Sequence, residues 1–465
     1  MSLVIVDAEL RGRKVSVRLA DRLVAELGDD VSPRPGDDVI DARGGALVPG
    51  LHDHHVHLRA ALAAAGSVRL GPPEVTGPDE LRRRLAKSAS QARPWEWVRG
   101  VGYHESVSGL PDRWMLDEIA HHVPVRIQHR SGALWMLNSR GVDLLGLADV
   151  VDEAVERDQS GRPTGRIWRG DHLLRRADAP RDMDAGEFGV TEASYGVTGF
   201  TDASADNSDA HFRWIVDSTE SGSLRTRVHV MRPIGSPLVR SGLVSTGPVK
   251  VLLDDQALPG LDELADIVAG AHGEGRKVAV HCVTRAQIVL TVAALKAAGS
   301  SGGDRIEHGS VVPRAIDREL LSLGAVVVTQ PNFVDERGDR YLVEVDEEDL
   351  ADLYRCGSLL EAGVSVAAGT DAPFGGADPW AAMRAAVERR TRAGSPLGCG
   401  ERVAAMRALE LFLGEADRPE RQRTISPGAA ADLCLLSAPL EAVLGDLSAE
   451  AVRMTIVGGS PVHGE

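Results

Sequence analysis

Cysteine is scarce in this chain of 465 residues. The four cysteines lie far apart and show no paired spacing: Cys282, Cys356, Cys399 and Cys434. This pattern excludes a disulfide framework and a cysteine zinc site as organising features, so we expect a reducing, cytoplasmic location. The sequence also lacks any run of roughly 18 apolar residues, and we therefore expect neither a signal peptide nor a membrane span.

Positive charge is in the minority. The chain has 52 Lys and Arg against 68 Asp and Glu, which gives a net charge of -16. This balance argues against a sequence-independent grip on nucleic acid or on an anionic membrane. Apolar residues at 43% and charged residues at 26% are ordinary values for a globular protein and exclude global disorder. We expect a small-molecule partner, and the sequence leaves open whether the chain forms a homo-oligomer.

Lysine is the rarest charged residue, with five copies against 47 arginines. Lys250 lies within the apolar run GPVKVLLDD, where burial of an unpaired ammonium would be costly. Two interpretations remain open. Lys250 is either paired with Asp254 or Asp202, or carboxylated, so that its carbamate oxygens bridge two divalent ions.

Alternation of short apolar runs with helix-like segments predicts βαβ units and a parallel sheet. Eight runs read as strands followed by polar residues, and eight such strands predict a (β/α)8 TIM barrel with its chemistry at the carboxyl ends of the strands. The eight segments are Leu51–His57, Val197–Ala203, Arg227–Arg232, Val249–Asp254, Val278–Cys282, Arg305–His308, Ala325–Gln330 and Ser365–Asp371.

The two ends of the chain have a different pattern, in which short apolar runs are separated by turn residues. We predict that residues 1–49 and 417–465 build one small β-domain and that residues 50–416 form the barrel. A segment of about residues 60–190 separates the first two barrel strands. A connection of that length predicts an inserted subdomain rather than a structureless loop.

Histidines gather in HDHHVH, directly after Val48-Pro49-Gly50. Alternate residues of a strand share a face, so His52 with His54, or His55 with His57, could present two imidazoles to one metal ion. Three later strands also end in residues of metal-ligand type: His281, His308 and Asp371. Each is weak alone, but together they predict a metal site at the carboxyl ends of the barrel strands.

These motifs resemble the amidohydrolase superfamily of metal-dependent hydrolases, in the branch that includes N-substituted formamide deformylase. Its first-strand pattern matches Pro49, Gly50, Leu51, Asp53, His55 and His57, and its later strands match VKVLLDD, RIEHGS, TQPNF and GTDAPF. The resemblance implies a TIM barrel joined to a small β-sandwich formed by both chain ends. It also implies a binuclear metal centre, most simply two Zn²⁺ bridged by carboxylated lysine, with the ligand set His55, His57, Lys250, His281, His308 and Asp371.

The activity that follows from this resemblance is hydrolysis of an amide-type C–N bond, in an N-acyl or N-formyl amide, by a metal-bound hydroxide. Asp371 would take the proton from the water and return it to the leaving nitrogen. The alternatives are a mononuclear deaminase, a lactone or ester hydrolase, and a non-catalytic barrel. Deaminase relatives carry a glutamate three residues after the fifth-strand histidine, where this chain has Thr284.

Substrate contacts are expected from the inserted segment and from the loop after the seventh strand, because binding residues concentrate on loops carried by a rigid barrel. Aromatic residues make up only 4% of the chain. Ordinary packing is the competing interpretation for each candidate. The candidates are Tyr103, His104, Trp135, Trp168, Asn332 and Phe333.

Overall fold

A computed structural model describes residues 2–174, 185–205, 207–300 and 302–464. The chain divides into two compact units. The first comprises Met1–Leu58 together with Ala185–Glu465, and the second comprises Arg59–Asp184.

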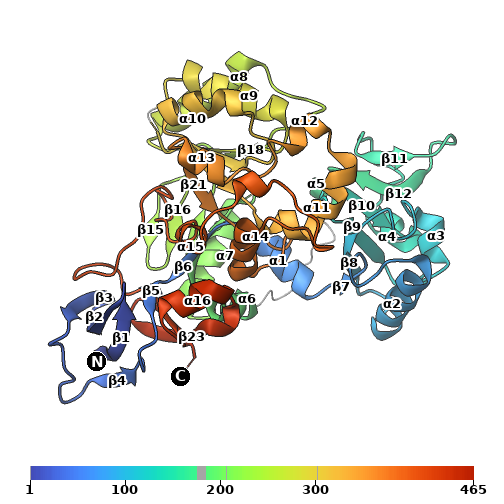
Figure 1. The fold of residues 1–465 in the computed structure, drawn as a ribbon. Coiled ribbons are helices and arrows are strands. Elements are labelled where there is room, and N and C mark those ends of the chain that lie inside the picture. The colour runs from blue at the N-terminus through green and yellow to red at the C-terminus, as the bar shows by residue number, and fades with distance from the viewer. Residues whose placement is uncertain (1, 175–184, 206, 301, 465) are drawn as a thin grey trace. The chain divides into compact units, whose positions relative to one another are not determined.

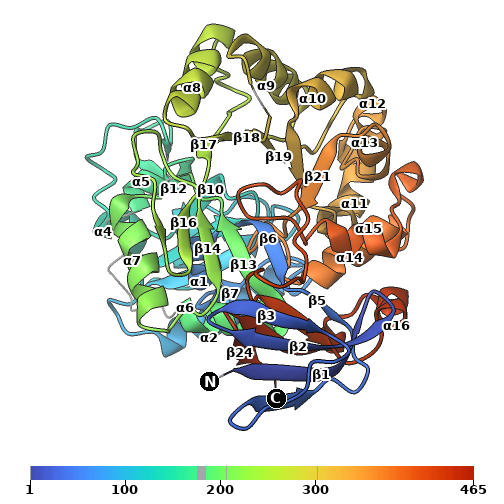
Figure 2. The same cartoon turned by 90° about the vertical axis from the view of Figure 1, so that its left-hand side faces the viewer.

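Both chain ends contribute to two small sheets of the first unit (Figure 2). One sheet has the order β3-β2-β1-β4, with β1 at Leu3–Leu10, β2 at Arg13–Ala20, β3 at Leu23–Gly28 and β4 at Asp38–Asp41. The other has the order β24-β23-β22-β5, with β5 at Leu47–Pro49, β22 at Leu433–Leu436, β23 at Val452–Val457 and β24 at Ser460–His463. Side chains from both termini, among them Ile5, Leu19, Leu433 and Ile456, pack into one apolar cluster. The strands expected at the two ends of the chain are therefore present.

All eight segments predicted as barrel strands contain a strand, and they belong to two larger sheets of the same unit. One has the order β15-β16-β14-β13-β6, with β6 at Leu51–Val56, β13 at Val197–Asp202, β14 at Arg227–Val230, β15 at Arg240–Ser241 and β16 at Val244–Thr246. The other is all parallel and has the order β17-β18-β19-β20-β21, with β17 at Val249–Val251, β18 at Val278–Cys282, β19 at Arg305–His308, β20 at Val326–Thr329 and β21 at Ser365–Ala368.

The described strands form these two sheets and not one continuous closed ladder. Strand β16 was not among the eight predicted strands, and it pairs with β14 on the side where β17 was expected. Pro248 separates β16 from β17, and its carbonyl accepts a hydrogen bond from Arg232 N at 3.2 Å. At the other edges of the two sheets, a single bridge joins Val56 to Ala372. The fold shown is thus a mixed α/β fold with hydrogen bonds between both pairs of sheet edges.

Helices of the first unit follow most of these strands. They are α6 (Ala185–Ser194), α7 (Asp209–Glu220), α8 (Leu261–Gly273), α9 (Arg285–Ala297), α10 (Asp317–Leu323), α11 (Asn332–Glu344), α12 (Glu347–Leu350), α13 (Gly357–Glu361), α14 (Pro379–Glu388), α15 (Ala405–Glu410) and α16 (Leu440–Asp446). Figure 2 shows α8, α9 and α10 along the outside of β17, β18 and β19. Buried Val280, Ile306, Leu295 and Leu320 belong to the cluster between these helices and strands. This packing fixes where each strand ends.

The second unit contains a six-stranded sheet in the order β11-β12-β10-β9-β8-β7. Its strands are β7 (Val68–Arg69), β8 (Val98–Tyr103), β9 (Val125–His129), β10 (Leu134–Leu137), β11 (Val155–Arg157) and β12 (Pro163–Trp168), and its helices are α2 (Pro78–Gln91), α3 (Arg113–Asp117), α4 (Ser139–Leu144) and α5 (Asp171–Leu174), while α1 (Leu58–Ala65) leads into it. Leu85, Val98, Ile127 and Met136 pack in its own core. The elements are labelled in Figure 1.

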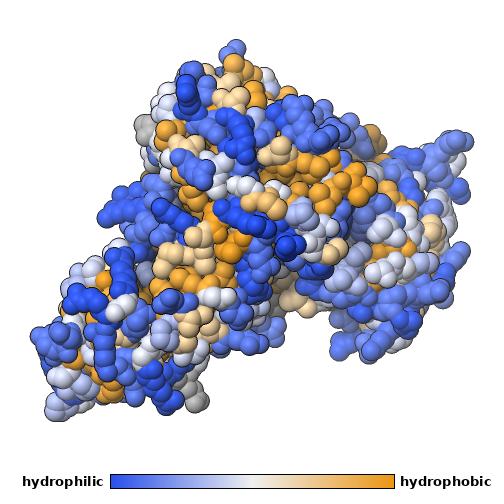
Figure 3. Space-filling model, in the orientation of Figure 1, coloured by the Kyte–Doolittle hydropathy of each residue, from blue (hydrophilic) through white to orange (hydrophobic). Residues whose placement is uncertain are grey.

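Among the described residues, no helix is long and apolar enough to cross a membrane. Hydrophilic and hydrophobic residues are interspersed over the face of the molecule that Figure 3 shows.

Candidate metal centre

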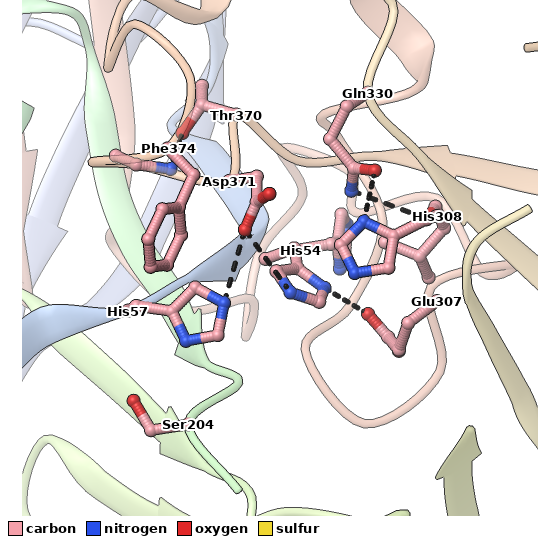
Figure 4. A network of polar contacts seen from close by, with 12 residues as sticks. His54, His57, Ser204, Glu307, His308, Gln330, Thr370, Asp371 and Phe374 are labelled. Atoms are coloured by element: carbon pink, nitrogen blue, oxygen red, sulfur yellow. Dashed lines mark hydrogen bonds and ion pairs between the residues drawn. The ribbon is translucent and has the colours of Figure 1, made fainter. Parts of the chain in front are cut away.

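The end of β6 and the loop after β21 bring three predicted ligands together. The Nε2 atom of His57 lies 3.1 Å from Asp371 Oδ1, and the Nε2 atom of His55 lies 3.6 Å from the same oxygen. Donor atoms of all three residues lie within 4.8 Å of one another. Figure 4 shows His57 and Asp371 facing each other. Of the two histidine pairs left open by strand alternation, His55 with His57 is the pair that meets the aspartate.

Backbone contacts hold these side chains in place. Asp53 accepts hydrogen bonds from the backbone N–H groups of His55 and Thr370, each at 3.0 Å, and from the Thr370 hydroxyl at 2.5 Å. The backbone N–H of Asp371 donates to the His55 carbonyl at 2.8 Å. A Cβ at Gly369 would lie 2.5 Å from His55 N, so only glycine allows this close approach. These hydrogen bonds connect the end of β6 to the segment after β21 and hold the backbone next to the three ligands.

The candidate residues include two strained backbone positions. His308 has φ 67° and Asp371 has φ 59°, in the left-handed region that non-glycine residues seldom adopt. Such conformations persist where surrounding structure over-determines them, and they concentrate at functional sites. Strain at two predicted ligands agrees with a role in chemistry.

Two imidazoles are fixed by acceptors on their Nδ1 atoms. Gln330 Oε1 lies 2.8 Å from His308 Nδ1, as drawn in Figure 4, and a carboxylate oxygen of Glu307 accepts from His55 Nδ1. Because both partner oxygens can only accept, each Nδ1 carries the proton and each Nε2 keeps its lone pair. This is the arrangement in which histidine binds metals. Burial first, and then neighbouring positive charge, hold the pKa of both imidazoles well below the usual range, so they are neutral.

His281 and Lys250 are the two remaining residues of the predicted ligand set. The ring centroids of His281 and His308 are 4.5 Å apart, and those of His55 and His308 are 4.6 Å apart. The Nζ atom of Lys250, on β17, is buried and has no hydrogen-bond partner among the described residues. Pairing with Asp202 is not observed, because that carboxylate binds Ser204 at 2.7 Å and His211 at 3.1 Å. Burial lowers the pKa of Lys250, while the charges of Glu307 and Asp371 act against that shift.

The donor set fits a divalent cation. His55 Nε2, Asp371 Oδ1 and Lys250 Nζ are buried polar atoms that make no hydrogen bond among the described residues. Buried polar atoms are nearly always hydrogen-bonded, so three such atoms among the six predicted ligands require an explanation. Imidazole and carboxylate are zinc ligands, and a metal ion would satisfy them.

Residues 38–463 match the amidohydrolase family, which is nearly the whole chain. The chain belongs to the amidohydrolase family. It is therefore an enzyme, a hydrolase of the class that acts on carbon–nitrogen bonds other than peptide bonds. Family membership implies a divalent metal, and the His55, His57 and Asp371 group is a candidate to hold it.

This amidohydrolase is 27% identical to N-substituted formamide deformylase from Arthrobacter pascens, over 94% of this chain and 92% of the relative. Two solved structures share its fold. An uncharacterized metal-dependent hydrolase from Pyrococcus horikoshii OT3 has 19% identity and a TM-score of 0.76, with 100% of both chains covered. Another from Pyrococcus furiosus has 21% identity and a TM-score of 0.73, covering 94% of this chain and 99% of that chain.

Several residues that shape the site lie in motifs of the sequence analysis but were not predicted to act in the site. Glu307 and Gln330 orient two histidines, Asp53 holds the Thr370 backbone, and Phe374 packs edge-on against His57 with ring centroids 5.2 Å apart. Glu307 directly precedes His308 in the RIEH motif, and Gln330 ends the seventh strand segment. Their positions next to predicted strand ends were the available signal.

The predicted substrate residues lie in both units. Asn332 and Phe333 begin α11 and are buried, and the Asn332 amide donates to the Thr370 carbonyl at 3.0 Å. The other four belong to the second unit: Tyr103, His104, Trp135 and Trp168. Tyr103 is fully buried, with its hydroxyl donating to the Gly109 carbonyl at 2.7 Å. Contact with a substrate remains a prediction for all six.

Trp135→Ala tests the competing interpretation of packing in this amidohydrolase. The Trp135 side chain is 5% exposed, packs with Leu137 and Ile167, and donates from Nε1 to Asp171 at 2.9 Å. We expect the variant to lose about 3–5 kcal/mol of unfolding free energy, the usual cost of truncating a buried aromatic residue. Chemical denaturation measures this loss. Trp168→Ala, at a residue 43% exposed, is the control and should cost far less. Unchanged stability with altered substrate preference would instead support a role in binding.

Proposed function

We propose that this amidohydrolase is a metal-dependent enzyme that cleaves an amide-type C–N bond, in an N-acyl or N-formyl amide of a small molecule. The observation that carries the proposal is the convergence of His55, His57 and Asp371. The buried Lys250 amine on β17, which has no hydrogen-bond partner among the described residues, adds to it. The name of the Arthrobacter relative supports N-formyl or N-acyl amides as the class of substrate. We further propose a cytoplasmic protein whose partner is a small molecule, neither nucleic acid nor membrane, and which is compatible with a homo-oligomer.

The proposed scaffold is a (β/α)8 TIM barrel of residues 50–416, with a β-sandwich of residues 1–49 and 417–465 and a subdomain inserted at about residues 60–190. Support comes from the order of the eight strands and from the hydrogen bonds between the edges of the two sheets. Gly247 N donates to the Val230 carbonyl at 2.7 Å on one side, and His57 N donates to the Ala372 carbonyl at 2.8 Å on the other. In such a barrel the six predicted ligands would lie at the carboxyl ends of the strands, where barrel enzymes place their chemistry.

The proposed metal is zinc, as two ions bridged by carboxylated Lys250. His55, His57 and Asp371 would hold one ion, and His281 and His308 the other. Burial lowers the pKa of Lys250 and so favours its neutral amine, which can add to carbon dioxide, form an N–C bond and release one proton. When bound, a divalent metal of this kind acidifies a coordinated water and polarises a carbonyl oxygen.

Residues of the chain supply orientation and proton transfer. In this proposal the Asp371 carboxylate would accept a proton and return it to the leaving nitrogen. Its Oδ1 lies 3.1 Å from His57 Nε2. Glu307 and Gln330 keep two histidine Nε2 atoms unprotonated. The Phe374 ring packs edge-on against the His57 imidazole, with ring centroids 5.2 Å apart.

A mononuclear deaminase and a lactone or ester hydrolase are the alternatives, and a non-catalytic barrel ranks below them. Thr284 stands where deaminase relatives carry glutamate, and in this structure it caps α9. Its hydroxyl accepts from Gln287 N at 3.3 Å, and the Gln287 side-chain oxygen accepts from Thr284 N at 3.3 Å. A residue used as a helix cap gives no acid for ring deamination, which favours hydrolysis of an amide. All six ligand positions keep ligand-type side chains, which disfavours the non-catalytic alternative.

A product analysis tests the proposed reaction. The zinc-loaded enzyme is offered N-formyl and N-acetyl amines, the matched formyl and acetyl esters, and aminopyrimidines, and the products are identified by mass spectrometry. We expect a free amine and a carboxylic acid from the amides. Ammonia released only from the aminopyrimidines would support the deaminase alternative. Cleavage confined to esters would contradict the amide assignment.

Glu307→Gln should weaken metal binding at this centre. The carboxylate of Glu307 is fully buried, accepts from His55 Nδ1 and is held by Arg305 Nε at 2.7 Å. Loss of a group that orients a ligand typically costs 10–100-fold in metal affinity. We expect a shift of that size in the zinc concentration that restores activity after chelation. Glu344→Gln, at an exposed ion pair with Arg340, is the control. Identical zinc titrations for the two variants would remove Glu307 from this role.

A further inference from the structure

A second cluster of metal-ligand side chains lies in the unit formed by Arg59–Asp184. His104 follows β8, and His129 ends β9, the parallel neighbour of β8 in the sheet (Figure 1). Tyr103 and His129 are paired in the strand register, and Arg130 N donates to the Tyr103 carbonyl at 2.8 Å. The two imidazoles therefore leave the carboxyl ends of adjacent strands, with ring centroids 5.7 Å apart.

Glu105 stands between the two imidazoles. Its Oε2 lies 3.2 Å from His104 Nε2 and 2.8 Å from His129 Nε2. The side chains of His104 and His129 are 9% and 12% exposed, while that of Glu105 is 46% exposed. Three donor atoms thus converge within 4.8 Å of one another, and the cluster opens to solvent on the carboxylate side.

We propose that His104, Glu105 and His129 form a binding site for a divalent cation of the zinc class, with a ligand set that shares no residue with His55, His57 and Asp371. Two imidazoles and one carboxylate are a zinc ligand set that leaves a position for water. Bonds of about 2.0–2.1 Å in tetrahedral geometry place neighbouring ligand atoms roughly 3.4 Å apart. The separation of 3.2 Å between His104 and Glu105 already approaches that spacing, and the separation of 2.8 Å at His129 requires a small side-chain shift.

Each imidazole also contacts, through its Nδ1 atom, the serine two residues further along the chain. His104 Nδ1 lies 2.8 Å from Ser106 Oγ, and His129 Nδ1 lies 2.7 Å from Ser131 Oγ. The backbone N–H groups of the same serines also donate to these Nδ1 atoms, Ser106 at 3.2 Å and Ser131 at 3.1 Å, so each Nε2 carries the proton and faces Glu105. A cation binding at Nε2 would displace that proton, and the serine hydroxyl could then accept from a proton on Nδ1. The same His-x-Ser arrangement follows both strands.

Backbone turns keep the three donors in place. Val107 N donates to the His104 carbonyl at 3.0 Å, Gly109 N to the Glu105 carbonyl at 2.7 Å, and Gly132 N to the His129 carbonyl at 2.9 Å. Burial acts to raise the pKa of Glu105, but hydrogen bonds and the two histidines outweigh it and lower the value to about 2. The carboxylate is therefore ionised, and an ion bound here would link the ends of β8 and β9.

Metal counting tests this site without relying on enzyme activity. Wild type, His129→Gln and Glu105→Gln are stripped with a chelator, equilibrated with zinc alone, desalted and measured by elemental analysis. His172→Gln is the matched control, because this exposed histidine of the same unit pairs with Asp152 at 2.8 Å outside the cluster. We expect His129→Gln and Glu105→Gln each to bind about one zinc ion fewer than wild type and the control. Equal zinc content in all four proteins would overturn the proposal.

Hydrogen exchange locates the ion and guards against a folding defect. Zinc should slow exchange at the ends of β8 and β9 in wild type and in His172→Gln, and not in Glu105→Gln, whose exchange without zinc should match wild type. Zinc-independent exchange in wild type at these segments would overturn the proposal. Both experiments compare wild type with variants of the second unit. Their results therefore do not depend on how many ions bind at His55, His57 and Asp371.

Discussion

Lys250→Ala is expected to lose at least tenfold in kcat/KM and a large part of the bound metal. The Lys250 amine is buried, carries a lowered pKa and has no hydrogen-bond partner in the described part of the chain, so its truncation removes a group that the surrounding structure does not use for an ion pair. If its carbamate bridges two ions, both the number of ions and the activation of water depend on it. Elemental analysis and steady-state kinetics on an N-formyl amine measure the two effects.

Chemical rescue separates a bridging carbamate from a packing role. Short carboxylic acids such as acetate or propionate can enter the space left in Lys250→Ala and supply two oxygens. We expect them to restore part of the metal content and part of the turnover in a concentration-dependent manner. Lys296→Ala, at an exposed position on α9, is the control and should behave as wild type. Wild-type metal content and turnover in Lys250→Ala would exclude the residue from the site.

Asp371→Asn should retain most of the metal and lose most of the turnover. The amide keeps an oxygen donor of the same shape, but it cannot accept and return a proton. Groups acting as general acid or base contribute about 10²–10⁴-fold to rate, and we expect a fall in kcat within that range. Single-turnover kinetics on the zinc-loaded variant, with its metal content measured in parallel, tests this.

The control for Asp371→Asn is the same substitution at an aspartate outside the metal centre. Asp335→Asn changes an exposed residue that pairs with Arg392 at 3.2 Å, and it should leave kcat unchanged. A near-normal rate in Asp371→Asn would reject proton transfer by that residue. Loss of all metal would show instead that Asp371 acts mainly as a ligand.

Local sequence patterns were enough to locate the strands that carry the candidate centre. Each of the eight apolar runs contains a strand, because hydrophobic residues followed by polar ones mark the buried strands of an α/β fold. The position of His55 and His57 on one face followed from alternation along β6. The family resemblance then singled out this pair, which the structure brings together with Asp371.

Contacts between distant parts of the chain could not be predicted in the same way. Glu307 contacts His55 across 252 positions of sequence, and Asp53 binds Thr370 across 317 positions. The short strand β16 lacks a long apolar run, so its insertion beside β14 left no clear pattern. His129 was not singled out, since a lone histidine at a strand end indicates a ligand only when its neighbours in space are known. Strand pairing and side-chain burial determine these contacts, and both arise only when the chain folds.

In the proposed function, this amidohydrolase works through a metal centre built on His55, His57, Lys250, His281, His308 and Asp371. The most direct test is elemental analysis of protein expressed with ample zinc and bicarbonate, in the His129→Gln background so that ions at the second cluster do not contribute. We predict about two zinc ions per chain, as in other two-metal hydrolytic sites. About one ion would contradict the lysine-bridged pair and favour the mononuclear alternative. A chain without metal that still hydrolyses amides would contradict the account as a whole.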